Sequence, residues 1–174
     1  MTLPYDDRPV AVRCPRCRGL AWCEPPFRFH SLLKRAVPKG TVPEKDGRKM
    51  VQWGGWWVEE KFPSIATWRP PAPNTGHYSW SPSVIRCTDC HLVGLHDLHW
   101  PADAYYQWRI HDFVLWAWSE EHARVLLDYI ASGDRDPDKY PRYASLLRKL
   151  PTFITAAKAR NSVVHHIRRS LEPS

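Results

Sequence analysis

The chain has 174 residues, 43% of them hydrophobic, and a formal net charge of +7 at pH 7. This length predicts one domain, and no apolar run reaches the roughly 18 residues of a transmembrane helix, so the composition excludes a helical membrane protein. The 17 prolines predict short regular elements, and ten tryptophans are unusual for this length.

Two Cys-x-x-Cys pairs are the strongest motif, and the first follows an extended lead-in with a short predicted strand at 10–13. Two intervening residues allow both sulfurs of a pair to face one ion about 2.3 Å away. Four thiolates complete the tetrahedral coordination of a structural zinc ion and leave no position open. The sequence therefore predicts one structural Zn²⁺ held by Cys14, Cys17, Cys87 and Cys90.

Disulfides and a redox motif are alternatives for the same cysteines. The first ten residues carry charges and no apolar run, which is unlike a secretory signal and favours a reducing compartment. The 69 residues between the pairs exceed the spacing of a compact ribbon, so either a subdomain is inserted or the pairs do not share an ion.

The residues next to the cysteine pairs also carry expectations. At Gly19 and Gly94 the chain is expected to leave the two turns through positive φ. Cys23 is interpreted as a packed apolar side chain and His91 as a less favoured alternative ligand.

The insert contains one strong hairpin signal. Gly54-Gly55 separates two β-favouring runs, which predicts a hairpin that places Trp53 opposite Trp56. Cross-strand packing is favoured for these tryptophans, and a stacking surface for nucleic-acid bases is the alternative. Loop chemistry at 38–47 and a proline-rich linker at 67–82 flank the hairpin, and a short strand at 83–86 leads to the second pair.

A histidine cluster follows the second pair: His91, His96, Asp97 and His99. Such residues bind catalytic metals or act in acid and base chemistry. Leucines and a valine alternate with them, so we favour a strand and turn that covers the zinc site.

The remainder predicts helices. Asp103 is expected to cap a short helix at 104–109, and the aromatic run 113–118 fits either a buried strand or a continuing helix. Ser119 followed by two glutamates predicts a helix start, with an end at Gly133. Further helices are predicted from Pro141 to Pro151, at 153–158, and after a cap at Asn161 or Ser162.

Charge is segregated along the chain. Residues 8–49 hold eleven Lys or Arg against three acids, residues 87–138 hold three against ten, and residues 139–174 hold eight against one. The basic segments suggest nucleic-acid or partner contacts, although a charged helix face is usually only solvated. The candidate contact residues are Arg13, Arg16, Arg18, Trp53, Trp56, Arg168 and Arg169.

The cysteine pairs, the run Leu115-Trp-Ala-Trp-Ser-Glu-Glu-His-Ala123 and the segments 128–130, 150–154 and 157–161 carry a resemblance. The chain resembles small bacterial zinc-ribbon-containing proteins of unknown function with a helical C-terminal half. The resemblance implies zinc binding by the four cysteines and a bacterial cytoplasmic location. It implies no reaction.

We predict an α+β fold in one compact domain. A four-cysteine zinc ribbon spans 1–100, with an aromatic β-hairpin inserted at about 24–82, and packs on three or four short helices in 101–174. No catalytic motif stands out, so we expect a non-catalytic accessory or adaptor protein with a protein partner, no membrane and no small-molecule substrate. Nucleic-acid binding is the alternative, and a metal-dependent hydrolase that uses the histidine cluster is a third hypothesis.

Overall fold

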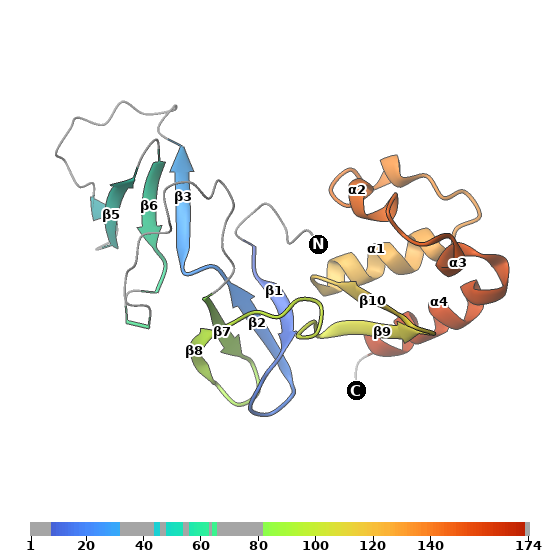
Figure 1. Cartoon of the computed structure of the whole chain (residues 1–174), viewed down its shortest axis with the longest axis horizontal. Coiled ribbons are helices and arrows are strands. Elements are labelled where there is room, and N and C mark those ends of the chain that lie inside the picture. Colours follow the sequence, from blue (N-terminus) through green and yellow to red (C-terminus); the bar gives the residue numbers. More distant parts are fainter. Residues whose placement is uncertain are drawn as a thin grey trace. The chain divides into compact units, whose positions relative to one another are not determined.

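The computed structural model describes residues 8–31, 44–45, 48–53, 56–62, 64–65 and 82–172 (Figure 1). This part of the chain is α+β, with antiparallel sheets and four α-helices, and none of its helices is long and apolar enough to cross a membrane. It divides into two compact units. The first holds the described parts of 1–9 and 14–99, and the second holds Val10–Arg13 and 100–172. The prediction of a single compact domain stays a prediction.

The first unit contains the strands that carry the cysteine pairs. Strands β2 (Leu20–Glu24), β7 (Ser83–Cys87) and β8 (Val93–His96) pair antiparallel in this order. The register places Ala21 opposite Cys87 and Glu24 opposite Val84. The long segment between the cysteine pairs therefore leaves the sheet and returns to it at neighbouring positions.

A second antiparallel sheet lies within the inserted segment. Its order is β3 (Phe27–Ser31), β6 (Trp56–Glu60), β5 (Arg48–Trp53) and β4 (Glu44–Lys45). Trp53 is opposite Trp56 in the register of β5 and β6, while the Gly54-Gly55 turn lies outside the described residues. The predicted role of these tryptophans in packing or stacking stays a prediction. The predicted linker at 67–82 and most of the loop at 38–47 also lie outside the described residues.

A buried carboxylate lies at the end of β2, where the insert begins. Glu24 is 4% exposed, and its carboxylate accepts hydrogen bonds from the Lys61 ammonium and, at 2.5 Å, from the Arg86 guanidinium. Both cations also lie over the ring of Phe62, 5.8 and 5.7 Å from its centroid. Because a buried charge is costly unless it is paired, these contacts hold the start of the insert, its β6 end and β7 together.

We expect Lys61→Met to lower the free energy of unfolding by about 2 kcal/mol, because it leaves the buried Glu24 carboxylate with a single cation. Arg86→Gln is the matched comparison. Arg86 is about half exposed, so water replaces part of its contact and the loss should be smaller. Urea unfolding of both variants measures the difference, and an equal or larger loss for Arg86→Gln would contradict this ranking.

The second unit is built on a hairpin whose second strand was one of the two alternatives predicted for the run 113–118 and whose first strand replaces a predicted helix. Residues 104–109 do not form the predicted helix, because Tyr106–Ile110 is strand β9 and pairs antiparallel with β10 (Phe113–Ala117). Tyr106, Trp108 and Ile110 are buried at every second position. In a strand these three side chains lie on one face, which can be covered, whereas in a helix they would point in different directions. Asp103 does not cap a helix. Its carbonyl accepts from the backbone N–H of Arg13 at 2.8 Å.

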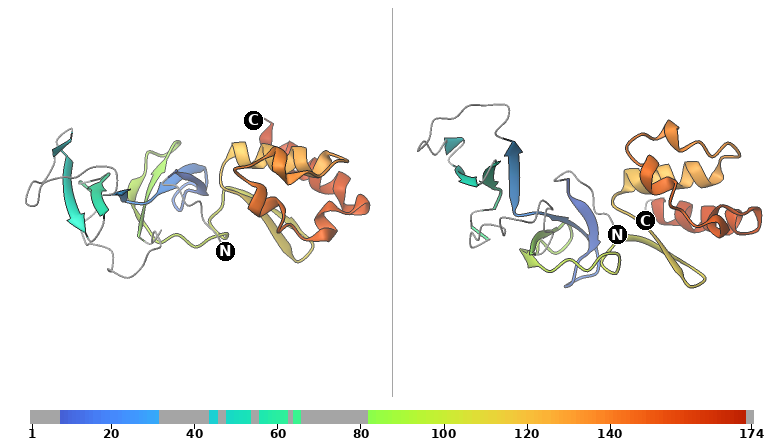
Figure 2. Two further views of the ribbon diagram at one scale, coloured as in Figure 1. Left: turned by 90° about the horizontal axis from the view of Figure 1, so that it is seen from above. Right: turned by 45° about the horizontal axis from the view of Figure 1, so that its top comes forward.

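Helices cover the buried face of this hairpin. Helix α1 (Glu120–Ala131) contacts β10, α4 (Ala157–Leu171) contacts β9, and the two helices contact each other (Figures 1 and 2). The Trp108 indole N–H donates to the Ser170 hydroxyl at 3.0 Å. Strand β1 (Val10–Arg13) completes the unit through backbone hydrogen bonds with Tyr105 and Trp118. The buried core combines aromatic side chains such as Trp108 with aliphatic ones: Leu115, Leu126, Ile130, Leu147, Ile154, Val163 and Ile167.

Helix boundaries agree with the sequence in one case and differ in three. The predicted Ser119 cap is confirmed, since its hydroxyl accepts from the His122 backbone N–H at 3.3 Å. The remaining helices are η2 (Pro137–Lys139), α2 (Ala144–Leu147) and α3 (Thr152–Thr155). Helix α2 is shorter than predicted. The predicted helix at 153–158 is broken at Ala156, whose extended backbone starts α4, so neither Asn161 nor Ser162 is its cap.

His122 is buried beside α2 within an aromatic cluster. Its ring stacks on Tyr143 with centroids 4.6 Å apart, and its Nδ1 accepts from the Trp118 backbone N–H at 3.2 Å. No partner for Nε2 lies among the described residues. Burial lowers the pKa of His122 to about 3, so the ring is neutral at pH 7.

We expect the protein to lose stability as the pH falls from 6.5 toward 3. In this range the unfolded chain binds a proton at His122 and the folded chain does not, so acid favours unfolding by roughly 4 kcal/mol at most. Urea unfolding between pH 7 and pH 4 measures the loss, and His122→Phe should flatten the profile. An NMR titration that places the pKa of His122 near 6.5 in the folded protein would contradict this expectation.

Candidate metal centre

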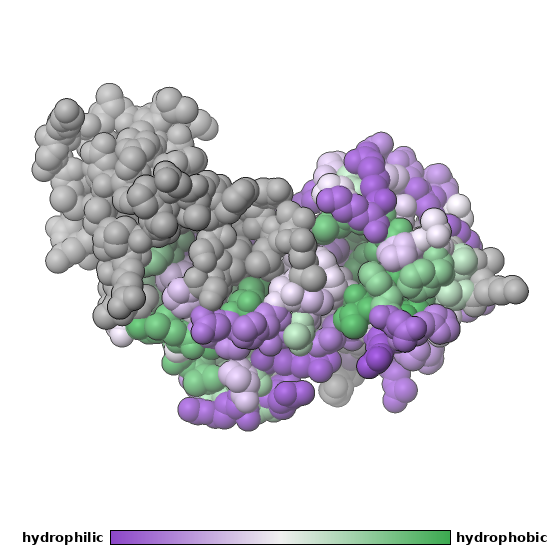
Figure 3. All heavy atoms as spheres, viewed as in Figure 1, coloured by the Kyte–Doolittle hydropathy of each residue, from purple (hydrophilic) through white to green (hydrophobic). Residues whose placement is uncertain are grey.

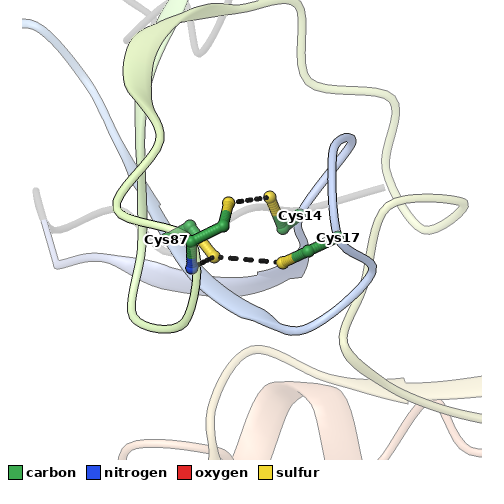
Figure 4. A group of neighbouring side chains, drawn as sticks. Cys14, Cys17 and Cys87 are labelled. Carbon is green, nitrogen blue, oxygen red and sulfur yellow. Dashed lines mark hydrogen bonds between the residues drawn. The ribbon is translucent and has the colours of Figure 1, made fainter.

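The four cysteines of the two predicted pairs lie together in the first unit. Their sulfurs are all within 4.8 Å of one another. Sγ of Cys14 is 3.6 Å from Sγ of Cys90, and Sγ of Cys17 is 3.5 Å from Sγ of Cys87. Figure 4 shows sulfurs from the two turns directed toward each other. All five cysteines are free, since these separations are far longer than the roughly 2.05 Å of a disulfide.

Both turns have the same backbone geometry. In the first, the backbone N–H of Cys14 donates to the carbonyl of Gly19 at 2.8 Å, and in the second that of Cys87 donates to Leu92 at 2.9 Å. Each bond spans five residues and closes the turn around its two sulfurs. The pairing of β2 with β7 then sets the turns side by side, and the backbone N–H of Thr88 adds a bond to the carbonyl of Leu20 at 3.1 Å.

The residues that reverse the chain are not the expected glycines. Positive φ occurs at Arg18 (67°) and His91 (54°), each directly after the second cysteine of its pair, and not at Gly19 or Gly94. Gly19 serves the site by its small size. A Cβ there would lie 1.8 Å from the Asp89 carboxylate and 3.4 Å from Sγ of Cys17.

The electrostatics of the cluster favour a cation. Burial acts to raise the pKa of the Cys14 thiol, but hydrogen bonds from the backbone N–H groups of Cys17 and Arg16 and contacts with the neighbouring sulfurs lower it to about 6. For Cys17, a backbone hydrogen bond from Gly19 lowers the pKa, but burial and the other three cysteines outweigh it and raise the pKa to about 12. The sulfurs therefore do not all ionise together without a positive charge among them.

The geometry of the cluster fits a metal ion. A tetrahedral zinc ion with Zn–S bonds near 2.3 Å separates its sulfurs by about 3.8 Å, close to the S–S distances found here. Backbone N–H groups of Asp89 and Cys90 lie 3.4 Å from Sγ of Cys87 and would support a thiolate there. The cluster is thus able to hold a metal, as in a zinc-ribbon-like site.

The other sequence candidates lie elsewhere. Cys23 is buried on β2 and outside the cluster. His91, His96, Asp97 and His99 do not converge: among the described residues, the four cysteines are the one group of three or more such side chains close enough to hold an ion. The catalytic-metal hypothesis receives no support from this arrangement. The arginine candidates divide between Arg16 and Arg18 in the first turn and Arg13, Arg168 and Arg169 in the second unit.

Two features of the site region were missed by sequence reasoning. One is the ion-pair group of Glu24, whose partners are 37 and 62 residues away along the chain. The other is the exposed pair Val93 and Leu95 on β8, which are 50% and 49% exposed. The alternation in residues 91–99 predicts a strand and turn over the zinc site, but alternation does not show which face of a strand is covered.

Comparison of the chain with protein-family models, with curated proteins and with solved structures gives no match.

We expect Arg18→Val to destabilise the metal-loaded protein and Arg18→Gly to preserve or raise its stability. A β-branched residue is strained at positive φ, at a cost of about 1–2 kcal/mol, whereas glycine is not. Thermal unfolding of both variants provides the measurement. Equal stabilities would mean that Arg18 does not have the left-handed conformation.

Proposed function

We propose that Cys14, Cys17, Cys87 and Cys90 bind one structural Zn²⁺, that this ion makes the first unit a zinc ribbon, and that the protein is a non-catalytic accessory or adaptor protein in a bacterial cytoplasmic assembly. The observation that carries the proposal is the closeness of the four sulfurs. Four cysteine ligands are typical of structural zinc sites, whereas catalytic zinc keeps one position for water or substrate.

The role of the ion follows from what it joins. The first pair precedes β2 and the second lies at the turn between β7 and β8, so one ion joins the start of β2 to that turn at one end of the small sheet. Small metal-bound modules gain much of their folding free energy from the ion. A rigid sheet with exposed apolar side chains suits contact with another protein, because desolvated apolar groups supply most of the binding energy at interfaces.

Metal content tests the first part of the proposal. We expect elemental analysis of the purified protein to give one zinc per chain, and Cys87→Ala to lose the zinc and much of the thermal stability. Cys23→Ala is the matched control, since Cys23 is also buried in this sheet but lies outside the cluster, and it should retain the ion. Zinc retained by Cys87→Ala at the wild-type level would refute the site.

The adaptor role requires a partner whose binding depends on the ribbon. The tagged protein is purified from its host, co-purifying proteins are identified, and each is prepared separately and titrated with the zinc-loaded protein by calorimetry. We expect saturable binding that is lost in Cys87→Ala. A zinc-loaded protein without any partner that binds in this reconstituted assay would contradict the adaptor role and leave the metal site intact.

Nucleic-acid binding is a second candidate, supported by Arg16 and Arg18, which are exposed in the first cysteine turn. Two cations on a rigid turn suit contact with phosphate groups. The test is fluorescence anisotropy with a labelled DNA duplex at low salt. A phosphate-driven mode predicts affinity that falls steeply with salt and weakens in the double variant Arg16→Ala, Arg18→Ala, and binding that is absent or insensitive to salt would reject it.

A further inference from the structure

The outer backbone edge of strand β8 pairs with no other strand among the described residues. The backbone N–H of Cys87 donates to the carbonyl of Leu92, which fixes the alternation of hydrogen bonds along the β7–β8 pair. Leu92, Gly94 and His96 therefore direct their N–H and C=O groups toward β7, and Val93 and Leu95 direct theirs away from it. Among the described residues β7 is the only strand that pairs with β8.

The side chains of the same two residues are also exposed. Val93 and Leu95 are opposite Arg86 and Val84, on the face of the sheet that also carries Trp22. Among the residues whose side-chain burial the structure describes, they are the two most exposed large hydrophobic residues. Figure 3 shows hydrophobic side chains at the surface over the end of the sheet where β8 lies. β8 carries none of the lysines or prolines that normally protect an edge strand from pairing.

We propose that β8 pairs antiparallel with β8 of a second copy of the chain, so that two zinc-ribbon sheets join into one continuous sheet. The two-fold axis passes through Gly94, and Val93 of each copy is opposite Leu95 of the other. This register joins the outward-facing backbone groups in about four hydrogen bonds. It also brings the exposed valine and leucine side chains of both copies together on one face.

The ends of β8 select this register over its neighbours. His91, which has positive φ, precedes the strand, and Asp97 follows it. With the axis at Gly94, the backbone groups that pair belong to Val93 and Leu95, which both lie within the strand. A shift of the axis to Val93 would place Leu95 opposite His91, where the chain reverses. A shift to Leu95 places the exposed Val93 opposite the Asp97 carboxylate.

Gly94 leaves the axis open. A Cβ added at this glycine meets no atom within 4 Å, so two copies can approach closely there. Residues opposite each other in a pair without hydrogen bonds have Cα atoms about 4.5 Å apart, which lies within the range of a disulfide. A cysteine at this position can therefore report the predicted register.

Sedimentation of the zinc-loaded full chain from micromolar to millimolar concentration tests the dimer. We expect a concentration-dependent monomer–dimer equilibrium, with the dissociation constant raised at least tenfold by Leu95→Lys. Phe153→Lys is the matched control, since it places the same charge on another exposed apolar residue, in the second unit, and should leave the equilibrium unchanged. A monomer throughout, or a dimer that Leu95→Lys does not weaken, would overturn the proposal.

Mild oxidation tests the register. Gly94→Cys should give a disulfide-linked dimer, whereas wild-type protein treated identically should not, and Val93→Cys should cross-link at least tenfold more slowly. Preferential cross-linking of Val93→Cys would refute the two-fold axis at Gly94. The zinc content and melting temperature of each sample are recorded, so that loss of the metal site is distinguished from loss of self-pairing. The dimer proposal stands whether or not an adaptor partner exists.

Discussion

Four sulfur atoms within 4.8 Å of one another are the constraint on which the rest of the first unit depends. Sulfurs this close, each supplied by a turn that backbone hydrogen bonds hold in shape, either share protons or share a cation. The turns are therefore arranged so that the four sulfurs could hold one metal ion. Strands β2, β7 and β8 begin or end within a few residues of a cysteine. The positions of the four cysteines therefore constrain how these strands lie relative to one another.

Most of what could be predicted about the site came from the spacing of the cysteines. It predicted which four of the five cysteines converge and that Cys23 stays outside. The long spacer seemed to argue against convergence, but sequence separation is a poor guide when the two ends of an insert lie on paired strands. The Glu24 group escaped prediction because burial of a single glutamate leaves no periodic pattern. The reversal at Arg18 and His91 escaped because glycine is only the commonest residue at positive φ.

In the second unit, prediction succeeded where a local rule decides the structure and failed where packing decides it. The Ser119 cap and its two glutamates stabilise a helix start from within their own turn, so the sequence alone located it. Asp103 gave a similar local signal for residues 104–109, but the alternate burial of Tyr106, Trp108 and Ile110 depends on β10 and on helices α1 and α4. Ala156 separates α3 from α4 by its extended backbone conformation. An alanine side chain gives no signal from which this conformation could be predicted.

Strand β1 has a consequence for how the protein is made. Its last residue, Arg13, is followed directly by the first cysteine of the cluster, yet three residues with which the strand forms backbone hydrogen bonds, Asp103, Tyr105 and Trp118, lie in the C-terminal half. During translation the strand leaves the ribosome long before these partners exist. The cysteine cluster can gather once residue 90 has emerged, whereas the other unit must wait for nearly the whole polypeptide. A gene cut at residue 99 or 100 would separate β1 from the rest of the second unit, so the C-terminal part alone would not encode that unit completely.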